Sequence, residues 1–352
     1  MVQLTRRAFM GRTAGALAAA SGTSALLAAC GSDDKSSGST TANSAASGSS
    51  TVQVVNILPP QLGYTAEYIA DMDGYFKKEG LEVKVNTARG SAPAIQAILS
   101  GTALLSWVGW LESVIDIANE KAPIQAIAFT GRRSPLAIVS EKDKPLTQPQ
   151  DLVGKRIGIP SEGGTSETTL DLMLASNNIP VDEVPRQVTG FTPGTFELIK
   201  RGRVAGFIIG ASQEEQFRQA QPTSVFLETE KYVTDGLTYI TSQKGLQSSK
   251  AQIQAYMRAL KGAMEQILDD KASGYADTIK KLRSKYDFEE LKDDKVAKYY
   301  IQFISDGWVV DGRESLLKVD KEKWKKTYDA AVQVKAAKPN VDVTQNVVPG
   351  FS

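Results

Sequence analysis

Two counts narrow the chemistry that this chain of 352 residues can perform: it has no histidine and one cysteine. The absence of histidine excludes a Ser-His-Asp triad, a Cys-His pair and a zinc site with histidine ligands. A single thiol excludes a disulfide within the chain. Carboxylates, lysines, tyrosines and serines remain, but no acidic pair with the spacing of a catalytic acid and base is evident. We therefore expect a binding protein rather than an enzyme, with no metal and no cofactor.

Small residues at two strand-to-helix junctions are candidates for ligand binding. Ser91 stands before a predicted helix, and Gly163, Gly164 and Thr165 follow a predicted strand. Helix N-termini offer free N–H groups to a ligand oxygen, and glycine lets the ligand approach the backbone. Alternatively, Ser91 and Thr165 only cap their helices, as these residue types often do. Glu167 competes for the same helix dipole, which argues against a strongly anionic ligand at this junction.

Aromatic and polar residues after two other strands form a second group of candidates. Trp107 and Trp110 stand at the end of a predicted strand, and at most one of them faces the ligand if the strand continues through both. An indole there would stack on a planar ligand or cover a cation, whereas packing in the core is the alternative. Gln61 and Tyr64 follow the first predicted strand and would complete a polar and aromatic wall.

Charged and hydroxyl side chains complete the set. Arg132 and Arg133 are candidates for pairing with a carboxylate or a sulfonate, and an exposed surface pair is the alternative. Thr192 follows a predicted strand in the second half of the chain. We expect it to act in the same way as Thr165, with its hydroxyl near the ligand.

The first thirty residues have the pattern of an export signal. Arg6 and Arg7 form a basic start that resembles a twin-arginine signal, and an uncharged, alanine-rich stretch runs over 14–29. That stretch is shorter than the about 20 apolar residues of a membrane span. Cys30 follows two alanines, which resembles the lipobox of bacterial lipoproteins. We expect removal of residues 1–29 and lipid attachment to Cys30, with two acyl chains for stable anchoring.

The segment after the cysteine predicts a tether. Residues 31–50 hold eight serines and no large apolar residue, so they cannot bury enough surface to fold. The formal net charge of the chain is +1, and loss of the three arginines in 1–29 gives 1 − 3 = −2. A nearly neutral chain has no basic field for nucleic acid. We expect a monomer, anchored by its lipid to the extracytoplasmic face of the cell membrane.

Beyond the tether, short β-rich runs alternate with helical patterns, which favours an α/β fold with more than one sheet. The predicted strands are Val52–Leu58, Leu81–Val85, Leu104–Val108, Ile124–Phe129, Leu136–Ser140, Arg156–Ile159, Val184–Val188, Ala205–Ile209, Val225–Leu227 and Thr238–Thr241. The predicted helices are Pro93–Ser100, Ser166–Ser176, Thr195–Arg201, Lys250–Asp269, Tyr275–Lys285, Asp293–Asp306 and Lys321–Ala336.

Three segments resemble those of a known family. They are DGYFKKEGLEV over 73–83, GSAPAIQAILSG over 90–101 and DLVGKRIGIP over 151–160. They are similar to segments of substrate-binding proteins of ABC importers of the nitrate, sulfonate and taurine type, which are related to thiamine-pyrimidine-binding proteins. The resemblance runs from residue 51 to near residue 335.

This resemblance implies a type II periplasmic-binding-protein-like fold with two lobes, each a mixed sheet flanked by helices, and a ligand cleft between them. The first lobe would take 51–138 plus 240–352 and the second 139–239, with hinges over 136–140 and 237–242. The resemblance also implies capture of a small organic solute and its delivery to a permease and an ATPase. The solute would be sulfonate- or taurine-like, an aromatic acid or pyrimidine-like, and the two tryptophans favour a planar molecule over nitrate.

Two other functions stay open at this point. A sensor or adhesion lipoprotein could use the same scaffold, and a carboxylate-based enzyme is the third alternative. The fungal pyrimidine synthases related to this family use an active-site histidine and a cysteine-rich motif, and this chain has neither.

Overall fold

The computed structural model describes residues 50–88, 90–160, 162 and 164–351. The predicted signal, Cys30, all of the tether before its last residue, and Gly163 lie outside the described residues.

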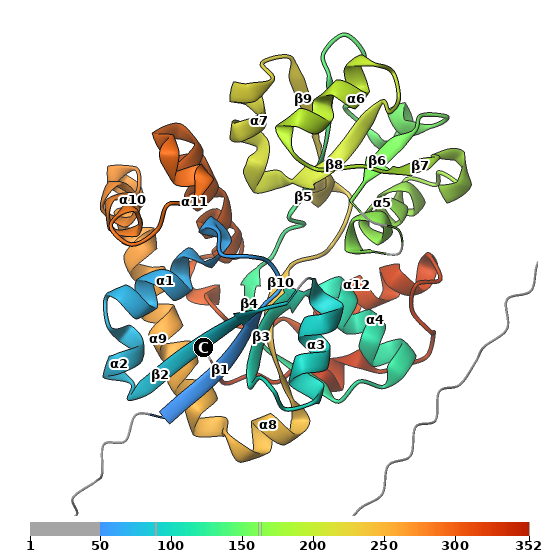
Figure 1. Cartoon of the computed structure of the whole chain (residues 1–352). Helices are drawn as coiled ribbons and strands as arrows, with labels where there is room; N and C mark the ends of the chain where they lie inside the picture. Colours follow the sequence, from blue (N-terminus) through green and yellow to red (C-terminus); the bar gives the residue numbers. More distant parts are fainter. Residues whose placement is uncertain (1–49, 89, 161, 163, 352) are drawn as a thin grey trace, which may run out of the picture. The chain divides into compact units, whose positions relative to one another are not determined.

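Two five-stranded sheets organise the described chain (Figure 1). The first has the order β2-β1-β3-β10-β4 and the second the order β7-β6-β8-β5-β9. The strands of the first sheet are β1 (Ser50–Asn56), β2 (Leu81–Thr87), β3 (Leu105–Gly109), β4 (Ile124–Gly131) and β10 (Leu237–Ser242). Those of the second sheet are β5 (Leu136–Glu141), β6 (Ile157–Ile159), β7 (Arg186–Val188), β8 (Gly206–Gly210) and β9 (Ser224–Glu228).

Both sheets are mixed, as the sequence predicts. β1 pairs parallel with β2 and β3, whereas β10 runs antiparallel to β3 and β4. In the second sheet β6 is parallel to β7 and β8, and β5 is antiparallel to β8 and β9. All ten predicted strands are confirmed, with ends shifted by at most two residues.

The helices include the seven that the sequence predicts, one of them split into a 3₁₀ turn (Pro193–Phe196) and the short helix α6. The helices are α1 (Thr65–Met72), α2 (Tyr75–Lys78), α3 (Ser91–Leu99), α4 (Trp110–Glu120), α5 (Thr165–Ser176), α6 (Glu197–Lys200), α7 (Glu214–Ala220), α8 (Gln243–Ser248), α9 (Lys250–Asp269), α10 (Ala276–Arg283), α11 (Asp294–Trp308) and α12 (Lys321–Gln333).

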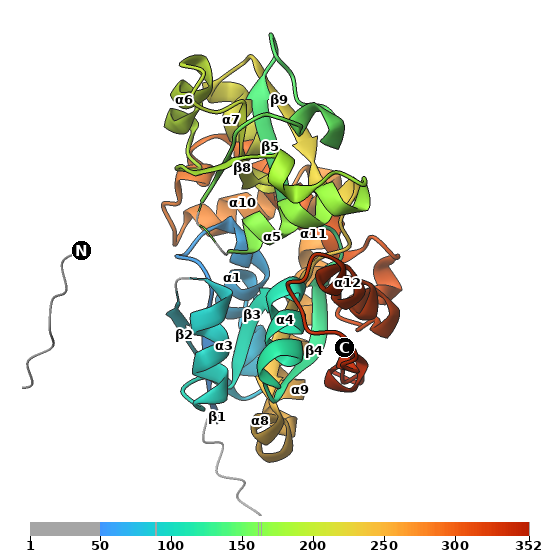
Figure 2. The same ribbon diagram turned by 90° about the vertical axis from the view of Figure 1, so that its right-hand side faces the viewer.

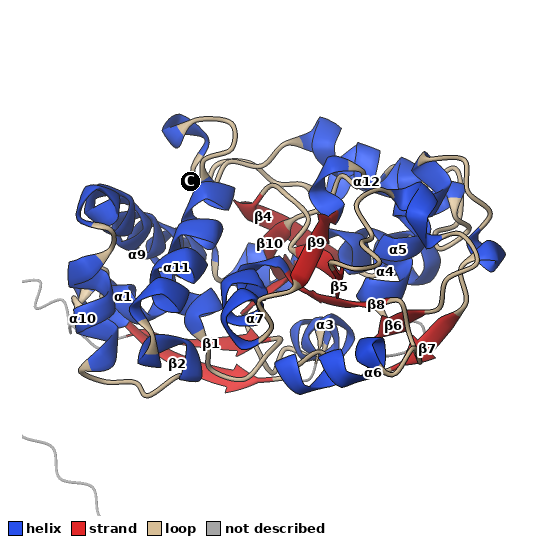
Figure 3. Cartoon of the chain, turned by 90° about the horizontal axis from the view of Figure 1, so that it is seen from above, coloured by secondary structure: helices blue, strands red, loops and turns tan. Residues whose placement is uncertain are grey.

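Helices cover both faces of each sheet (Figures 2 and 3). On the first sheet, α3, α4 and α12 pack on one face, and α1, α2, α9, α10 and α11 pack on the other. Strand β1 shows why: Val52 and Val54 contribute to one apolar cluster and Val55 to the other, because successive side chains point to opposite faces. On the second sheet, α5 contributes to the cluster on one face, and α6 and α7 pack on the other.

The chain crosses between the sheets twice, over 132–135 and over 229–236. The hinges expected over 136–140 and 237–242 are instead strands in the interior of a sheet, β5 and β10. Each of these strands is hydrogen-bonded to a neighbour on both sides, so backbone rotation within it would break a sheet. The two crossing segments, in contrast, lie outside both sheets.

A search of the described residues finds no helix with the length and apolar character needed to cross a bilayer.

Candidate functional site

Trp107 on β3 and Tyr64, in the 3₁₀ turn Leu62–Tyr64 after β1, form an aromatic pair. Their ring centroids are 5.2 Å apart with the planes at 70°. The indole Nε1 of Trp107 donates to Thr130 Oγ1 at 2.7 Å. The Tyr64 hydroxyl accepts the N–H of Leu58 at 3.0 Å, and burial raises its pKa. Both rings are thus held in place by the protein. Tyr64 is buried and Trp107 is half-buried, so Trp107 is the ring of the pair that a flat ligand could contact.

Gln61 lies beside this pair and keeps one donor unused. Its side-chain Oε1 accepts the Tyr300 hydroxyl at 2.6 Å, and its backbone N–H donates to the Tyr68 hydroxyl at 3.2 Å. Its Nε2 amino group has no partner among the residues that the structure describes. We call Gln61, Tyr64 and Trp107 the first-sheet group, because the loop after β1 and strand β3 hold them near one another.

The remaining small candidates stand at helix starts whose backbone N–H groups no N-cap side chain covers. Gly90 precedes Ser91 at the start of α3, with a φ of 103° that favours glycine. Gly164 is the N-cap of α5, with Thr165 as the first helical residue. Thr192 is exposed and precedes a short 3₁₀ turn. Within the described chain, no hydrogen bond or ring contact joins these residues to the first-sheet group.

Trp110 does not lie at a surface, which corrects the expectation that it lines a ligand site. Strand β3 ends at Gly109, and Trp110 is already the first residue of α4. Its side chain is fully buried, with ring centroids 4.3 Å from Phe129 and 6.4 Å from Trp324. The change from strand to helix after Gly109 directs the indole into the core between β4 and α12.

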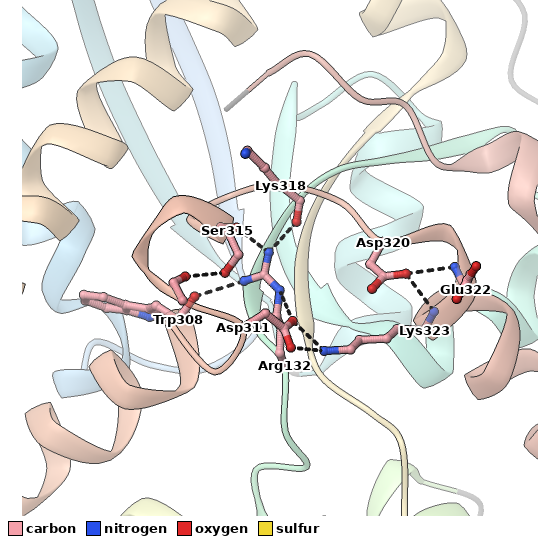
Figure 4. A network of polar contacts seen from close by, with 9 residues as sticks. Arg132, Trp308, Asp311, Ser315, Lys318, Asp320, Glu322 and Lys323 are labelled. Atoms are coloured by element: carbon pink, nitrogen blue, oxygen red, sulfur yellow. Dashed lines mark hydrogen bonds and ion pairs between the residues drawn. The ribbon is translucent and has the colours of Figure 1, made fainter.

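Arg132 is also a structural residue and not a free partner for an anionic ligand (Figure 4). Its side chain is buried, and the guanidinium donates to the carbonyl oxygens of Trp308 at 3.0 Å and of Ser315 and Lys318 at 2.5 Å. Its Nε lies 3.3 Å from Asp311. These contacts fasten the crossing segment to the chain after α11, so the predicted role of Arg132 in ligand binding is corrected.

Arg133 spans the crossing segments in a similar way. Its Nε lies 3.5 Å from Glu230 Oε2, and its guanidinium stacks 4.0 Å from the Phe303 ring. It also donates to the Phe303 carbonyl oxygen. The hydroxyls of Ser134 and Thr229 are 2.7 Å apart, which joins the first crossing to the second.

A buried carboxyl beneath the first-sheet group escaped the sequence analysis. Glu67 on α1 accepts hydrogen bonds from Asn56 Nδ2 at 2.8 Å, from the Tyr256 hydroxyl at 3.1 Å and from the Tyr239 hydroxyl. Burial raises the pKa of Glu67, and the three hydrogen bonds oppose that shift. Its partners lie on β1, β10 and α9, far apart in the sequence, so no local motif predicts the cluster. It fixes α1 against the first sheet directly after Tyr64.

Glu112 and Asp235 form a second unexpected group, the buried acid pair. Burial is the main cause that raises the pKa of Glu112 to about 8, and the charge of Asp235 adds to it. Burial likewise raises the pKa of Asp235 to about 7. Glu112 stands in the first turn of α4 and Asp235 in the second crossing segment. Among the described residues, no group of three or more acidic or cysteine side chains is arranged to hold a metal ion.

Comparison with known proteins gives the fold and the family. The family model described as NMT1/THI5 like matches residues 61–273, which is more than half of the chain. The alkanesulfonate-binding protein SsuA from Xanthomonas axonopodis pv. citri, solved with MOPS bound, superposes with a TM-score of 0.63 at 13% identity. That match covers 85% of this chain and 98% of the SsuA chain, and at this identity it shows the fold alone.

Two curated relatives are similar in sequence over part of their length. The formylaminopyrimidine-binding protein of Halalkalibacterium halodurans is 27% identical over 219 residues, 60% of this chain and 65% of the relative. The riboflavin-binding protein RibY of Chloroflexus aurantiacus is 28% identical over 136 residues, 38% of either chain. This chain thus spans less than two thirds of either relative. With its two mixed sheets flanked by helices and the match over 61–273, the chain belongs to the NMT1/THI5 like family and has the fold of periplasmic binding proteins.

Proposed function

We propose that this protein is the extracytoplasmic solute-binding subunit of an ABC importer. The observation that carries the proposal is the aromatic pair of Trp107, beside the last residue of β1, and Tyr64, in the turn after β1, in a two-sheet fold of this family. In open α/β sheets, ligands bind beyond the carboxyl ends of the strands. The ligand would lie between the first-sheet group and the helix start at Gly164 and Thr165 in the second sheet. The lobes would meet at the crossings 132–135 and 229–236.

We propose a planar nitrogen heterocycle as the ligand. Arg132 and Arg133 are the cations among the described candidates. The guanidinium of Arg132 is directed at carbonyl oxygens and Asp311, and that of Arg133 at Glu230 and Phe303. A sulfonate or carboxylate would therefore depend on backbone N–H groups. A heterocycle would instead stack on Trp107 and accept a hydrogen bond from Gln61 Nε2. The ligands in the names of the two curated relatives, a formylaminopyrimidine and riboflavin, are both planar heterocycles.

Calorimetric titration with a formylaminopyrimidine, riboflavin, an alkanesulfonate and an aromatic carboxylate tests the ligand class. We expect saturable heat and a raised melting temperature with one of the two heterocycles. Trp107→Leu should weaken that binding at least tenfold, because stacking is worth about 1–1.5 kcal/mol and apolar contact adds to it. Phe288→Leu, a half-buried ring outside the candidate group, is the control and should bind as the wild type does. Binding of the sulfonate alone would contradict the heterocycle proposal.

We further propose that Cys30 carries lipid and holds the protein at the membrane. The support is the signal-like sequence before it and the serine-rich segment after it. Cys30→Ala should move the protein from the detergent-rich to the aqueous phase in a phase-partition assay. Ser36→Ala in the tether should leave the partition unchanged. Aqueous wild-type protein, or no difference between wild type and Cys30→Ala, would exclude the anchor.

Delivery to a permease and an ATPase, as a monomer, belongs to the same proposal. Reconstitution of the lipid-anchored protein with a permease and an ATPase of its own organism should make uptake depend on this chain. Uptake that is equally fast without the chain would speak for a sensor or adhesion role.

A further inference from the structure

Helix α11 belongs to the packing of both sheets. Ala297, Tyr300 and Ile301 lie in the apolar cluster of the first sheet. Phe303, one turn further along the helix, packs against the cluster of the second sheet, which contains Phe207. α11 also contacts α7 and the 3₁₀ turns at Leu62–Tyr64 and Ala211–Gln213. One helix therefore contacts the loop after β1 and the loop after β8, where the two sheets would present their ligand-binding residues.

Tyr300 is the side chain at which these two loops meet. Its hydroxyl donates to Gln61 Oε1 at 2.6 Å and also interacts with Ser212, in the 3₁₀ turn after β8 that α11 contacts. The ring is buried, and burial raises the pKa of the phenol, so the hydroxyl keeps its proton at physiological pH. Gln61 is thus bound at Oε1, which leaves Nε2 as the free end of the amide.

Two further contacts join α11 to helix α7 of the second lobe. Gln219 on α7 donates to Asp293 Oδ1 at 3.1 Å, at the start of α11. Tyr299 is hydrogen-bonded to the buried carboxylate of Glu214 on α7. α11 is therefore fastened to the second sheet along its length, and Tyr300 is the contact that also reaches the first-sheet group.

We propose that Tyr300 is a positioning residue of the ligand site, which orients the Gln61 amide and links it to the second sheet through Ser212. The role of Tyr300 in ligand binding rests on the proposed function. Its role in linking the two lobes rests on the structure alone. Because Oε1 is held by the Tyr300 hydroxyl, the amide presents a donor and not an acceptor to the ligand. The ligand would then carry an acceptor at this point, such as a ring nitrogen or a carbonyl oxygen.

The conformational measurement needs no ligand. Spin labels at Lys155→Cys in the second lobe and Lys244→Cys in the first, in a chain with Cys30→Ser, report the distance between the lobes. We expect Tyr300→Phe, which keeps the ring, to broaden the distribution of that distance. Tyr275→Phe is the matched control, because it removes a buried hydroxyl that contacts α11 at Ser305 (2.9 Å) within the first lobe. Equal distributions for the wild type and Tyr300→Phe would overturn the link to the second sheet.

The binding measurement uses a formylaminopyrimidine and riboflavin as probes. Tyr300→Phe should weaken the binding of the recognised probe about tenfold, the usual effect of losing one buried hydrogen bond. In a Gln61→Ala background the same substitution should add less than about twofold, because the two residues act as one unit. Tyr275→Phe should leave affinity unchanged in both backgrounds.

The outcomes separate the two proposals. If Tyr300→Phe and Gln61→Ala lower the affinity for the probe by additive amounts, the positioning role of Tyr300 is overturned. The proposal that the protein binds a solute would still stand. A wild type that binds neither probe would count against the proposed ligand class, and the distance measurement would still decide the role of Tyr300.

Discussion

Arg132 and Glu112 are both buried side chains of charged types, and the fold treats them in opposite ways. The guanidinium of Arg132 has hydrogen bonds to three carbonyl oxygens and an ion pair with Asp311. Both carboxyl oxygens of Glu112 are buried without a hydrogen bond to another described residue. A buried charge with partners is stable as a charge, whereas an unpartnered carboxyl holds its proton.

Replacement of Arg132 should lower the stability of the protein and should not specifically weaken ligand binding. Arg132→Ala removes hydrogen bonds to three carbonyl oxygens and the ion pair with Asp311, which keeps its contact with Lys323, so we expect a loss of about 3 kcal/mol in the free energy of unfolding. Urea denaturation measures that loss. Arg258→Ala, which breaks an exposed pair with Glu79, should cost at most about 1 kcal/mol. A stable Arg132→Ala variant that fails to bind ligand would return Arg132 to the ligand site.

Glu112 makes the stability of the protein depend on pH. The pKa of Glu112 is raised from 4.5 to about 8, so the unfolded chain ionises first as the pH rises. Below the unfolded pKa both states hold the proton and the group has no effect. Between the two values the folded state must keep its proton, so the free energy of unfolding falls, and above about pH 8 the loss is complete.

Glu112→Gln should therefore stabilise the protein increasingly from about pH 5 to about pH 9, as measured by thermal unfolding across that range. Glu120→Gln, at the exposed end of the same helix, should give a pH profile parallel to that of the wild type. A constant difference between Glu112→Gln and the wild type would show that Glu112 does not titrate as proposed.

In the second crossing segment, Gly236 is packed too tightly for a larger residue. A Cβ on Gly236 would lie 2.2 Å from the Gly131 carbonyl oxygen and 2.8 Å from the Trp110 ring. The Gly236 carbonyl also accepts the Trp110 N–H at 2.9 Å, which ties the segment to the start of α4. The segment before β10 is thus in direct contact with a buried strand-to-helix junction.

Gly236→Ala should lower the free energy of unfolding by about 2 kcal/mol or more, because a backbone oxygen cannot move aside as a flexible side chain can. Gly63→Ala is the control, since its Cβ would meet only ordinary contacts at 3.7 Å or more. Chemical denaturation of the two variants side by side gives the comparison. Equal stability of the two variants would mean that the backbone of the crossing segment shifts to accommodate the added Cβ at little cost.

The strands could be predicted because their apolar runs are short and bounded by turn residues. Helix α4 could not, since Trp110 continues the apolar run of β3 without a polar residue between them. The same continuity placed Trp110 at a strand end and suggested a ligand role. The first-sheet group could be predicted because Gln61 and Tyr64 are close in sequence and Trp107 lies near the end of the adjacent strand β3. Glu67 and Tyr256 are 189 residues apart, and only the sheet order brings them together.

At the scale of the whole molecule, the last described residues complete the core of the first sheet. Val348 N–H donates to the Ala126 carbonyl at 2.9 Å on edge strand β4, and Trp324 Nε1 donates to the Val343 carbonyl at 3.1 Å. The side chains of Val347 and Phe351 are buried. This segment therefore covers part of the edge strand β4, which Leu317 also bridges, and its buried side chains join the apolar clusters on both faces of the sheet.

A chain that ends at residue 340 should lose roughly 5 kcal/mol or more, since it exposes the apolar surface that Val343, Val347 and Phe351 bury. The midpoint of urea unfolding gives the measure. Gln345→Ala in the full-length chain alters an exposed residue of the same segment and should leave the midpoint in place. A shortened chain as stable as the full-length protein would rule out this role of the segment.

The position of β10 in the first sheet also fixes the order in which the protein can be completed during synthesis. The second sheet uses strands β5 to β9 without interruption, so all its strands exist once residue 228 has left the ribosome. The first sheet has a gap between β3 and β4 until residue 242 follows. The half of the molecule that begins first therefore finishes last, and until then β3 and β4 expose strand edges to which a chaperone or another chain could pair.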